Sequence, residues 1–167
     1  MKSLTLLVVR VLIVSLLLGC AKQPPPYVLR SKHSMLIRPG VSIGPVHAGM
    51  TKEQVVAKLG EPVKTEGDLL MYRNLSVFLA DDGSVGHVFC FAPSTNGPAT
   101  DVIAVHTKQG IGIWSSRADV ISAYGEPTAI KHENVHKENE VMIYESLRLQ
   151  FHIRSGSVYL IAVYFNK

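Results

Sequence analysis

The stretch Thr51-Lys-Glu-Gln-Val-Val-Ala-Lys-Leu-Gly-Glu-Pro62 has a second version later in the chain, Ser116-Arg-Ala-Asp-Val-Ile-Ser-Ala-Tyr-Gly-Glu-Pro127. Both begin with a hydroxyl residue suited to a helix N-cap and end in Gly-Glu-Pro, which stops a helix. Both carry an apolar stripe at i, i+1 and i+4. The sequence therefore predicts two short helices that begin after Thr51 and Ser116.

The ends of the two predicted helices follow known capping patterns. Gln54 completes a capping box in the first copy, and Asp119 gives a weaker version in the second. Gly60 and Gly125 are expected at the C′ positions in the left-handed conformation. A helix of about nine residues is not stable alone in water, so each helix must pack on a sheet.

Strand-like segments surround each predicted helix, with glycine-containing turns between them. They are expected at 35–37, 41–43, 69–73, 75–80 and 85–91 in the first half, and at 102–107, 141–145, 147–153 and 158–165 in the second. Residues 131–140 form a polar excursion without a counterpart in the first half. Strand alternation places Val85, His87, Phe89 and Phe91 on one face.

The predicted fold class is α+β, with two tandem repeats, each a short helix packed on an antiparallel sheet of three to four strands. Repeat 1 spans 35–98 and repeat 2 spans 99–167. The two repeats could join edge to edge in one longer sheet, which would cover an exposed edge on each. Alternatively, they pack separately and are joined by residues 92–100.

The N-terminal segment is predicted to be a lipoprotein signal peptide, residues 1–19. Lys2 and Arg10 give it a basic start, and the apolar run Val11–Leu18 is too short to span a bilayer. It ends in Leu17-Leu18-Gly19-Cys20, which resembles the lipobox of bacterial lipoproteins. The resemblance implies cleavage before Cys20, a thioether-linked diacylglycerol on its sulfur and an N-acyl chain such as palmitate. Ala21 after the cysteine favours, by the same resemblance, the outer membrane, facing the periplasm. An uncleaved anchor or an ordinary secretory signal is the alternative.

The mature chain is only mildly basic. Removing residues 1–19 takes away two of the 17 basic residues and none of the 13 acidic ones, which leaves 15 minus 13, or +2. Residues 20–34, with three consecutive prolines at 24–26, are interpreted as a lipidated cysteine followed by an extended tether. No Lys/Arg cluster stands out, so nucleic acid is not an expected partner.

The repeated stretch also resembles a known family. Gly49-Met50-Thr51 with Val55, then Leu59-Gly60-Glu61-Pro62, is similar to the signature of the SmpA/OmlA (BamE-like) outer-membrane lipoproteins, and 115–127 is a looser copy. The resemblance implies a helix-plus-sheet unit that assists β-barrel assembly. That family has one unit and this chain has two. A tandem of such units is similar to the β-lactamase-inhibitor-protein fold.

Two groups of residues are candidates for chemistry. His132 and His136 could bind a divalent ion with Glu133 or Glu140, but their polar surroundings favour a solvated loop and no metal site. Cys90 lies in the apolar sequence Val-Phe-Cys-Phe and is interpreted as a packed strand residue. A Cys90 hydrolase with His87 or His152 is the least favoured alternative.

The sequence therefore predicts a non-catalytic, membrane-anchored envelope lipoprotein that acts as a protein-binding or scaffold module. Its lipidation site is Cys20, and its candidate partner surface is Trp114, His132 and His136. We expect no cofactor and no metal, because no nucleotide or metal motif is complete. The alternative is an inhibitor or ligand-sensing module that uses the concave surface of the sheet.

Overall fold

The computed structural model describes residues 34–93, 103–133 and 136–165. The predicted signal peptide, Cys20 and the tether up to residue 33 lie outside these residues. Within the described ranges, no helix is long and apolar enough to cross a membrane.

Two α-helices lie where the repeated stretches predict them: α2 spans Lys52–Leu59 and α3 spans Arg117–Tyr124. Both capping boxes are complete, because each N-cap side chain accepts from the N3 backbone N–H and each N3 side chain accepts from the N-cap backbone. The second box is not the weaker one. The distance from the Asp119 nitrogen to Ser116 Oγ is 3.1 Å, whereas that from the Gln54 nitrogen to Thr51 Oγ1 is 3.4 Å.

Both helices end at glycines with positive φ, as predicted, but with a different ψ. Gly60 has φ 81° and ψ −175°, and Gly125 has φ 75° and ψ −168°. This is an extended backbone with positive φ, a region that only glycine occupies readily. The chain therefore leaves each helix at a sharp angle and turns directly toward the sheet.

Eight strands form one continuous antiparallel sheet in the order β4-β5-β6-β7-β12-β11-β10-β9. Their bounds are β4 Lys64–Glu66, β5 Leu69–Met71, β6 Leu75–Leu79, β7 Val85–Phe91, β9 Ala129–His132, β10 Glu140–Tyr144, β11 Leu149–Arg154 and β12 Ser157–Tyr164. The alternative of separately packed units is therefore wrong, and the edge-to-edge alternative is confirmed, with four strands from each half in one sheet. Pairing of β7 with β12 joins the halves, since it removes an open edge from each.

A second, smaller sheet has the order β3-β2-β1-β8. Its strands are β1 Ser34–Arg38, β2 Ser42–Ile43, β3 Val46–His47 and β8 Ala104–Thr107. β1 pairs antiparallel with β2 and parallel with β8, and a bridge joins His106 on β8 to Gly112. β1 thus lies between the β2–β3 hairpin on one side and β8, which turns back at Gly110, on the other.

Several short elements, β3 among them, differ from the sequence prediction. β4 and β9 were not predicted, because their residues are mostly charged or polar and show no apolar alternation. The predicted polar excursion is shorter than 131–140, since β9 extends to His132 and β10 begins at Glu140. A 3-10 helix, Glu145–Leu147, delays the start of β11 to Leu149.

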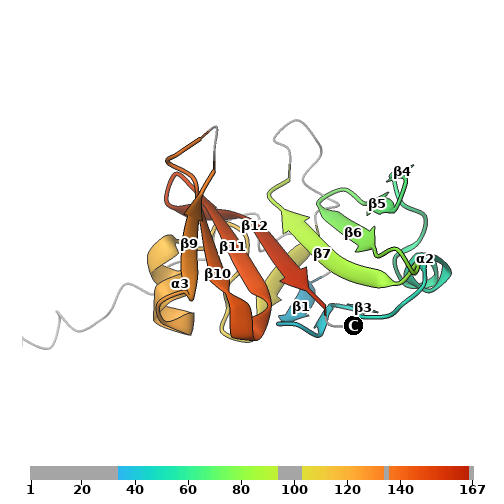
Figure 1. The fold of residues 1–167 in the computed structure, drawn as a ribbon, viewed down its shortest axis with the longest axis horizontal. Coiled ribbons are helices and arrows are strands. Elements are labelled where there is room, and N and C mark those ends of the chain that lie inside the picture. The colour runs from blue at the N-terminus through green and yellow to red at the C-terminus, as the bar shows by residue number, and fades with distance from the viewer. Residues whose placement is uncertain (1–33, 94–102, 134–135, 166–167) are drawn as a thin grey trace, which may run out of the picture.

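The core lies between the inner face of the eight-stranded sheet and a layer made of α2, the small sheet and α3. Figure 1 shows α3 beside β9 and β10, α2 at the other end of the molecule, and β1 and β3 between them. Val55 of α2 and Val120 of α3 are fully buried in this core, together with Val88, Phe151 and other inner-face residues. Both helices therefore cover the same face of the large sheet.

Candidate binding face

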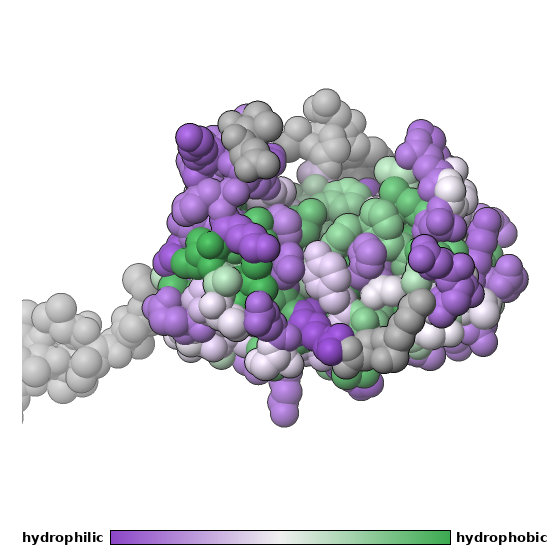
Figure 2. Space-filling view, viewed as in Figure 1, coloured by the Kyte–Doolittle hydropathy of each residue, from purple (hydrophilic) through white to green (hydrophobic). Residues whose placement is uncertain are grey.

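The other face of the eight-stranded sheet is not covered by any described helix or strand. Side chains alternate across a strand, so the residues between the buried inner-face positions point to this side. They include Phe78 of β6, His87 and Phe89 of β7, Gln150 of β11 and Tyr164 of β12, all half-buried. We call this surface the open face. Figure 2 shows apolar residues gathered across the middle of the molecule, where β6, β7 and β12 lie in Figure 1.

Four rings from three neighbouring strands form an aromatic cluster at the centre of the open face. Phe78 stacks on His87 with ring centroids 4.6 Å apart and an interplanar angle of 21°. Phe89 packs against both, at 5.1 Å and 5.2 Å, and Tyr164 lies 5.5 Å from His87. Sequence reasoning did not select this cluster, because Phe78 and Tyr164 join the other two only through pairing between distant strands.

The aromatic surroundings change the acid–base behaviour of the cluster. Burial lowers the pKa of His87, because the neighbouring rings replace water that would solvate the imidazolium. Burial also raises the pKa of Tyr164, whose hydroxyl donates a long bond of 3.4 Å to Gln150 Oε1. The centre of the open face is therefore neutral at pH 7.

Val85 does not share this face with His87, contrary to the prediction. The register of β6 and β7 shifts between Phe78 and Leu79, so that Phe78 pairs with His87 but Leu79 pairs with Val85. This bulge at Gly86 rotates the start of β7 and buries Val85 in the core, where it is 2% exposed.

A polar cluster borders the open face near the β11–β12 turn. The Tyr159 hydroxyl donates to Glu133, and Asn139 Nδ2 donates to the same carboxylate at 2.9 Å. The Arg154 guanidinium lies 4.2 Å from the centre of the Tyr159 ring. Burial and the Glu133 bond raise the pKa of Tyr159 to about 12. His152 packs edge-on against Tyr159, and burial lowers its pKa.

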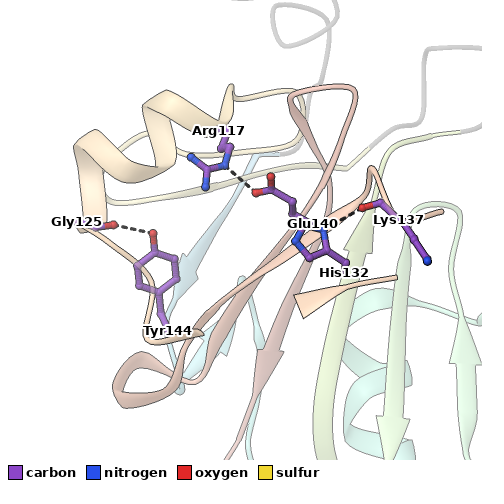
Figure 3. Close-up of polar contacts among 6 residues, drawn as sticks. All are labelled: Arg117, Gly125, His132, Lys137, Glu140 and Tyr144. Atoms are coloured by element: carbon purple, nitrogen blue, oxygen red, sulfur yellow. Dashed lines mark hydrogen bonds and ion pairs between the residues drawn. The ribbon is translucent and has the colours of Figure 1, made fainter. Parts of the chain in front are cut away.

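His132, the last residue of β9, and His136, on the connection to β10, are both exposed and do not form a ligand pair. His132 Nδ1 hydrogen-bonds the Lys137 carbonyl oxygen at 2.9 Å, and His136 Nδ1 lies 3.6 Å from Glu138. Glu140 is bound instead to Arg117 Nε at 2.7 Å, as Figure 3 shows. Among the described residues, no group of three or more His, Cys, Asp or Glu side chains could hold a metal ion.

Trp114 precedes α3 and is 39% exposed. Its backbone has φ 72°, and its N–H donates to the Val158 carbonyl at 2.7 Å. Trp114 therefore lies next to the start of β12, at the end of the sheet. His132 lies at the same end of the sheet, three strands away. It pairs with Glu140 on β10, which pairs with Ile153 on β11, the partner of Val158.

Cys90 is fully buried on the inner face of β7. Burial raises the pKa of its thiol, and the polar group near its Sγ is Asn74 Nδ2 at 3.7 Å. His87 and His152 point to the open face, on the other side of the sheet. The structure therefore does not assemble the Cys/His pair that a hydrolase would need.

No protein-family model and no curated protein matches this chain. Two solved structures are similar to it. One is a DUF4309 family protein (YjgB) from Bacillus subtilis, with 13% identity and a TM-score of 0.47 over 68% of this chain and 77% of that one. The other is an extracellular protein containing an SCP domain from Bacillus anthracis, with 10% identity and a TM-score of 0.41. The match covers 71% of this chain and 44% of the second protein.

Proposed function

We propose that the chain is a non-catalytic envelope lipoprotein, anchored through Cys20 in the outer membrane, that binds a protein partner through the open face. The observation that carries this proposal is the aromatic cluster of Phe78, His87, Phe89 and Tyr164, which no described helix or strand covers. Aromatic enrichment and depletion of charged residues are typical of the centres of protein–protein interfaces. Large aromatic side chains also supply much of the binding energy at such centres.

The two halves are, in this proposal, diverged copies of one SmpA/OmlA-like unit. The strand order of the large sheet supports it, because the sheet reads β4 to β7 from one edge and β9 to β12 from the other. Each half also ties a tyrosine hydroxyl to the carbonyl of its helix-terminating glycine, Gly60 or Gly125. Outer-membrane assembly or maintenance is the process that this resemblance favours.

Site-specific photo-crosslinking in cells tests the proposed face. A photoreactive phenylalanine analogue at Phe89 should give a discrete crosslinked product. The same analogue at Lys58, an exposed residue of α2 on the other layer, should not. With the analogue at Gln150, on the open face, the substitution Phe89→Asp should abolish the product, because it places a charge in the aromatic cluster.

Absence of a product from both Phe89 and Gln150 across growth conditions would contradict the proposal, as would an equal product from Lys58. The captured protein also decides between scaffolding and inhibition. If it is a periplasmic hydrolase whose activity the purified chain blocks, the inhibitor alternative is favoured.

A further inference from the structure

The small sheet and the segments that flank it carry basic but no acidic side chains. None of the 13 acidic residues falls within 34–50 or 103–115. These two segments contain Arg38 and Lys108, together with two histidines, and both cationic residues are exposed. Within the layer opposite the open face, the small sheet and its flanking segments therefore carry a net positive charge.

The same layer exposes large apolar side chains. Leu36 is 37% exposed, Val41 56% and Trp114 39%, and these are three of the five large hydrophobic residues exposed in the described part of the chain. Ile37, next to Leu36 on β1, is buried. Alternation along the strand therefore directs Leu36 away from the core.

Trp114 has a positive φ, a backbone conformation that is unfavourable for a tryptophan. Gly49, the corresponding residue before α2, has nearly the same φ, 75° against 72°. Its N–H also donates to the matching strand residue, Val85 in place of Val158. A bulky residue at positive φ is an outlier that is retained only with compensation, and such outliers gather at functional sites. A tryptophan is thus held partly exposed where glycine would fit without strain.

The chain enters the structure through this layer, because β1 begins at Ser34. Only 13 residues separate Ser34 from Cys20, and they span at most about 45 Å when fully extended. Given the proposed lipid anchor at Cys20, a membrane surface is always within reach of the small sheet.

We propose that Leu36, Arg38, Val41, Lys108 and Trp114, here named the anchor-side face, dock on an anionic lipid surface. Tryptophan is enriched at membrane–water interfaces because its ring is amphipathic. Basic residues near an anionic leaflet are attracted to its headgroups. Docking in this orientation turns the open face away from the membrane, toward a partner in the periplasm. The inference goes beyond the proposed partner binding and rests only on the proposed anchor.

Trp114 is the only tryptophan of the chain, so its fluorescence reports docking directly. The full chain, isolated from membranes, is reconstituted in phosphatidylglycerol or phosphatidylcholine vesicles that contain a nitroxide-labelled lipid. We expect a blue shift and strong quenching of Trp114 emission in phosphatidylglycerol, weakened by salt. The matched control is the double variant Trp114→Phe/Phe89→Trp, which moves the fluorophore to the open face and should escape quenching.

Charge reversal provides a second readout that keeps Trp114 in place. Arg38→Glu and Lys108→Glu should each weaken docking by about 25-fold, because each reversal changes the charge by two units and each unit contributes about fivefold. Urea unfolding checks that the fold is retained. Equal quenching of Trp114 and of the control tryptophan would overturn the inference. So would a Trp114 signal that responds to a protein partner and not to lipid.

The anchor is read separately, by mass spectrometry of the Cys20 peptide. Absence of acylation would contradict the proposed anchor. It would not decide docking, because the quenching of the two tryptophan positions is compared on vesicle-bound chain, whatever holds the N-terminus there.

Discussion

Tyr72 and Tyr144 make the same contact in the two halves of the molecule. The Tyr72 hydroxyl donates to the Gly60 carbonyl at 3.1 Å, and the Tyr144 hydroxyl donates to the Gly125 carbonyl at 2.9 Å. Both tyrosines are buried. Each bond ties the C-terminal end of a helix to a strand segment of the large sheet, at a point where the helix has unpaired carbonyls.

Removing either hydroxyl should destabilise the fold. We expect Tyr72→Phe and Tyr144→Phe each to lower the free energy of unfolding by about 1 kcal/mol, the usual worth of such a hydrogen bond. Urea denaturation of each variant measures the change. Tyr164→Phe is the matched control, because its bond to Gln150 is long, and it should change stability little. Equal losses of stability in all three variants would show that the bonds to Gly60 and Gly125 contribute no more than the long bond of Tyr164.

Trp114 provides a test of backbone strain. Trp114→Ala and Trp114→Gly both remove the side chain, but only glycine relieves the positive φ. Trp114→Gly should therefore be more stable than Trp114→Ala by about 1–2 kcal/mol, as measured by urea denaturation.

A substitution at Gly49, the corresponding residue before α2, is the control for Trp114. Gly49→Ala should lower the free energy of unfolding by a similar amount. A Cβ at residue 49 would meet nothing within 4 Å, so the loss would come from the backbone conformation alone. If Trp114→Ala equals Trp114→Gly in stability, the strain is absent.

Cys90 should be unreactive in the folded protein. Its thiol is fully buried and burial raises its pKa, so iodoacetamide should modify Cys90 only after unfolding. The unfolded thiol ionises near its ordinary value of 9.0 while the folded thiol stays neutral. Stability should therefore fall as the pH rises above that value. Mass spectrometry of the Cys90 peptide with and without urea reads the modification, and rapid labelling of the native chain would be incompatible with the buried position.

His87 and His152 should make the fold sensitive to mild acid. Burial lowers the pKa of both in the folded state, so below the ordinary value of 6.5 the unfolded chain binds more protons. Stability is therefore expected to fall as the pH drops through 6.5 toward the lowered folded values. Urea midpoints at pH 7.5 and 5.5 measure the effect, in a range above the ordinary carboxyl value of 4.5.

His87→Phe isolates the contribution of the aromatic cluster. This variant should lose less stability between the two pH values than the parent chain does. His136→Gln, at an exposed position, should behave like the parent. An unchanged pH dependence in His87→Phe would show that burial of His87 does not contribute to the pH dependence of stability.

The parts of the fold that depend on local chemistry could be predicted from the sequence. Thr51 and Ser116 place the helix starts, and the turns at Gly83 and Gly156 lie where the sequence indicates them. Pairing between distant segments could not be predicted in the same way. The parallel pairing of β1 with β8 and the bulge beside Gly86 depend on the whole sheet.

The candidate site follows the same division. Alternation predicts that Val85, His87, Phe89 and Phe91 share a face. The structure confirms this for the last three, but the bulge beside Gly86 turns Val85 into the core. Alternation does not indicate that Phe78 and Tyr164 complete the cluster, because that depends on the register of three strands. The sequence names Trp114 as part of the candidate partner surface, but residue type alone gives no sign of a positive φ there.

The position of β1 between β2 and β8 has a mechanical consequence. A strand at an edge can be peeled away one hydrogen bond at a time. β1 is paired on both sides, so a pull along its axis from Ser34 loads the bonds to both neighbours together, in shear. Tension applied through the proposed anchor at Cys20 would therefore act on a strand that is hydrogen-bonded to neighbours on both sides.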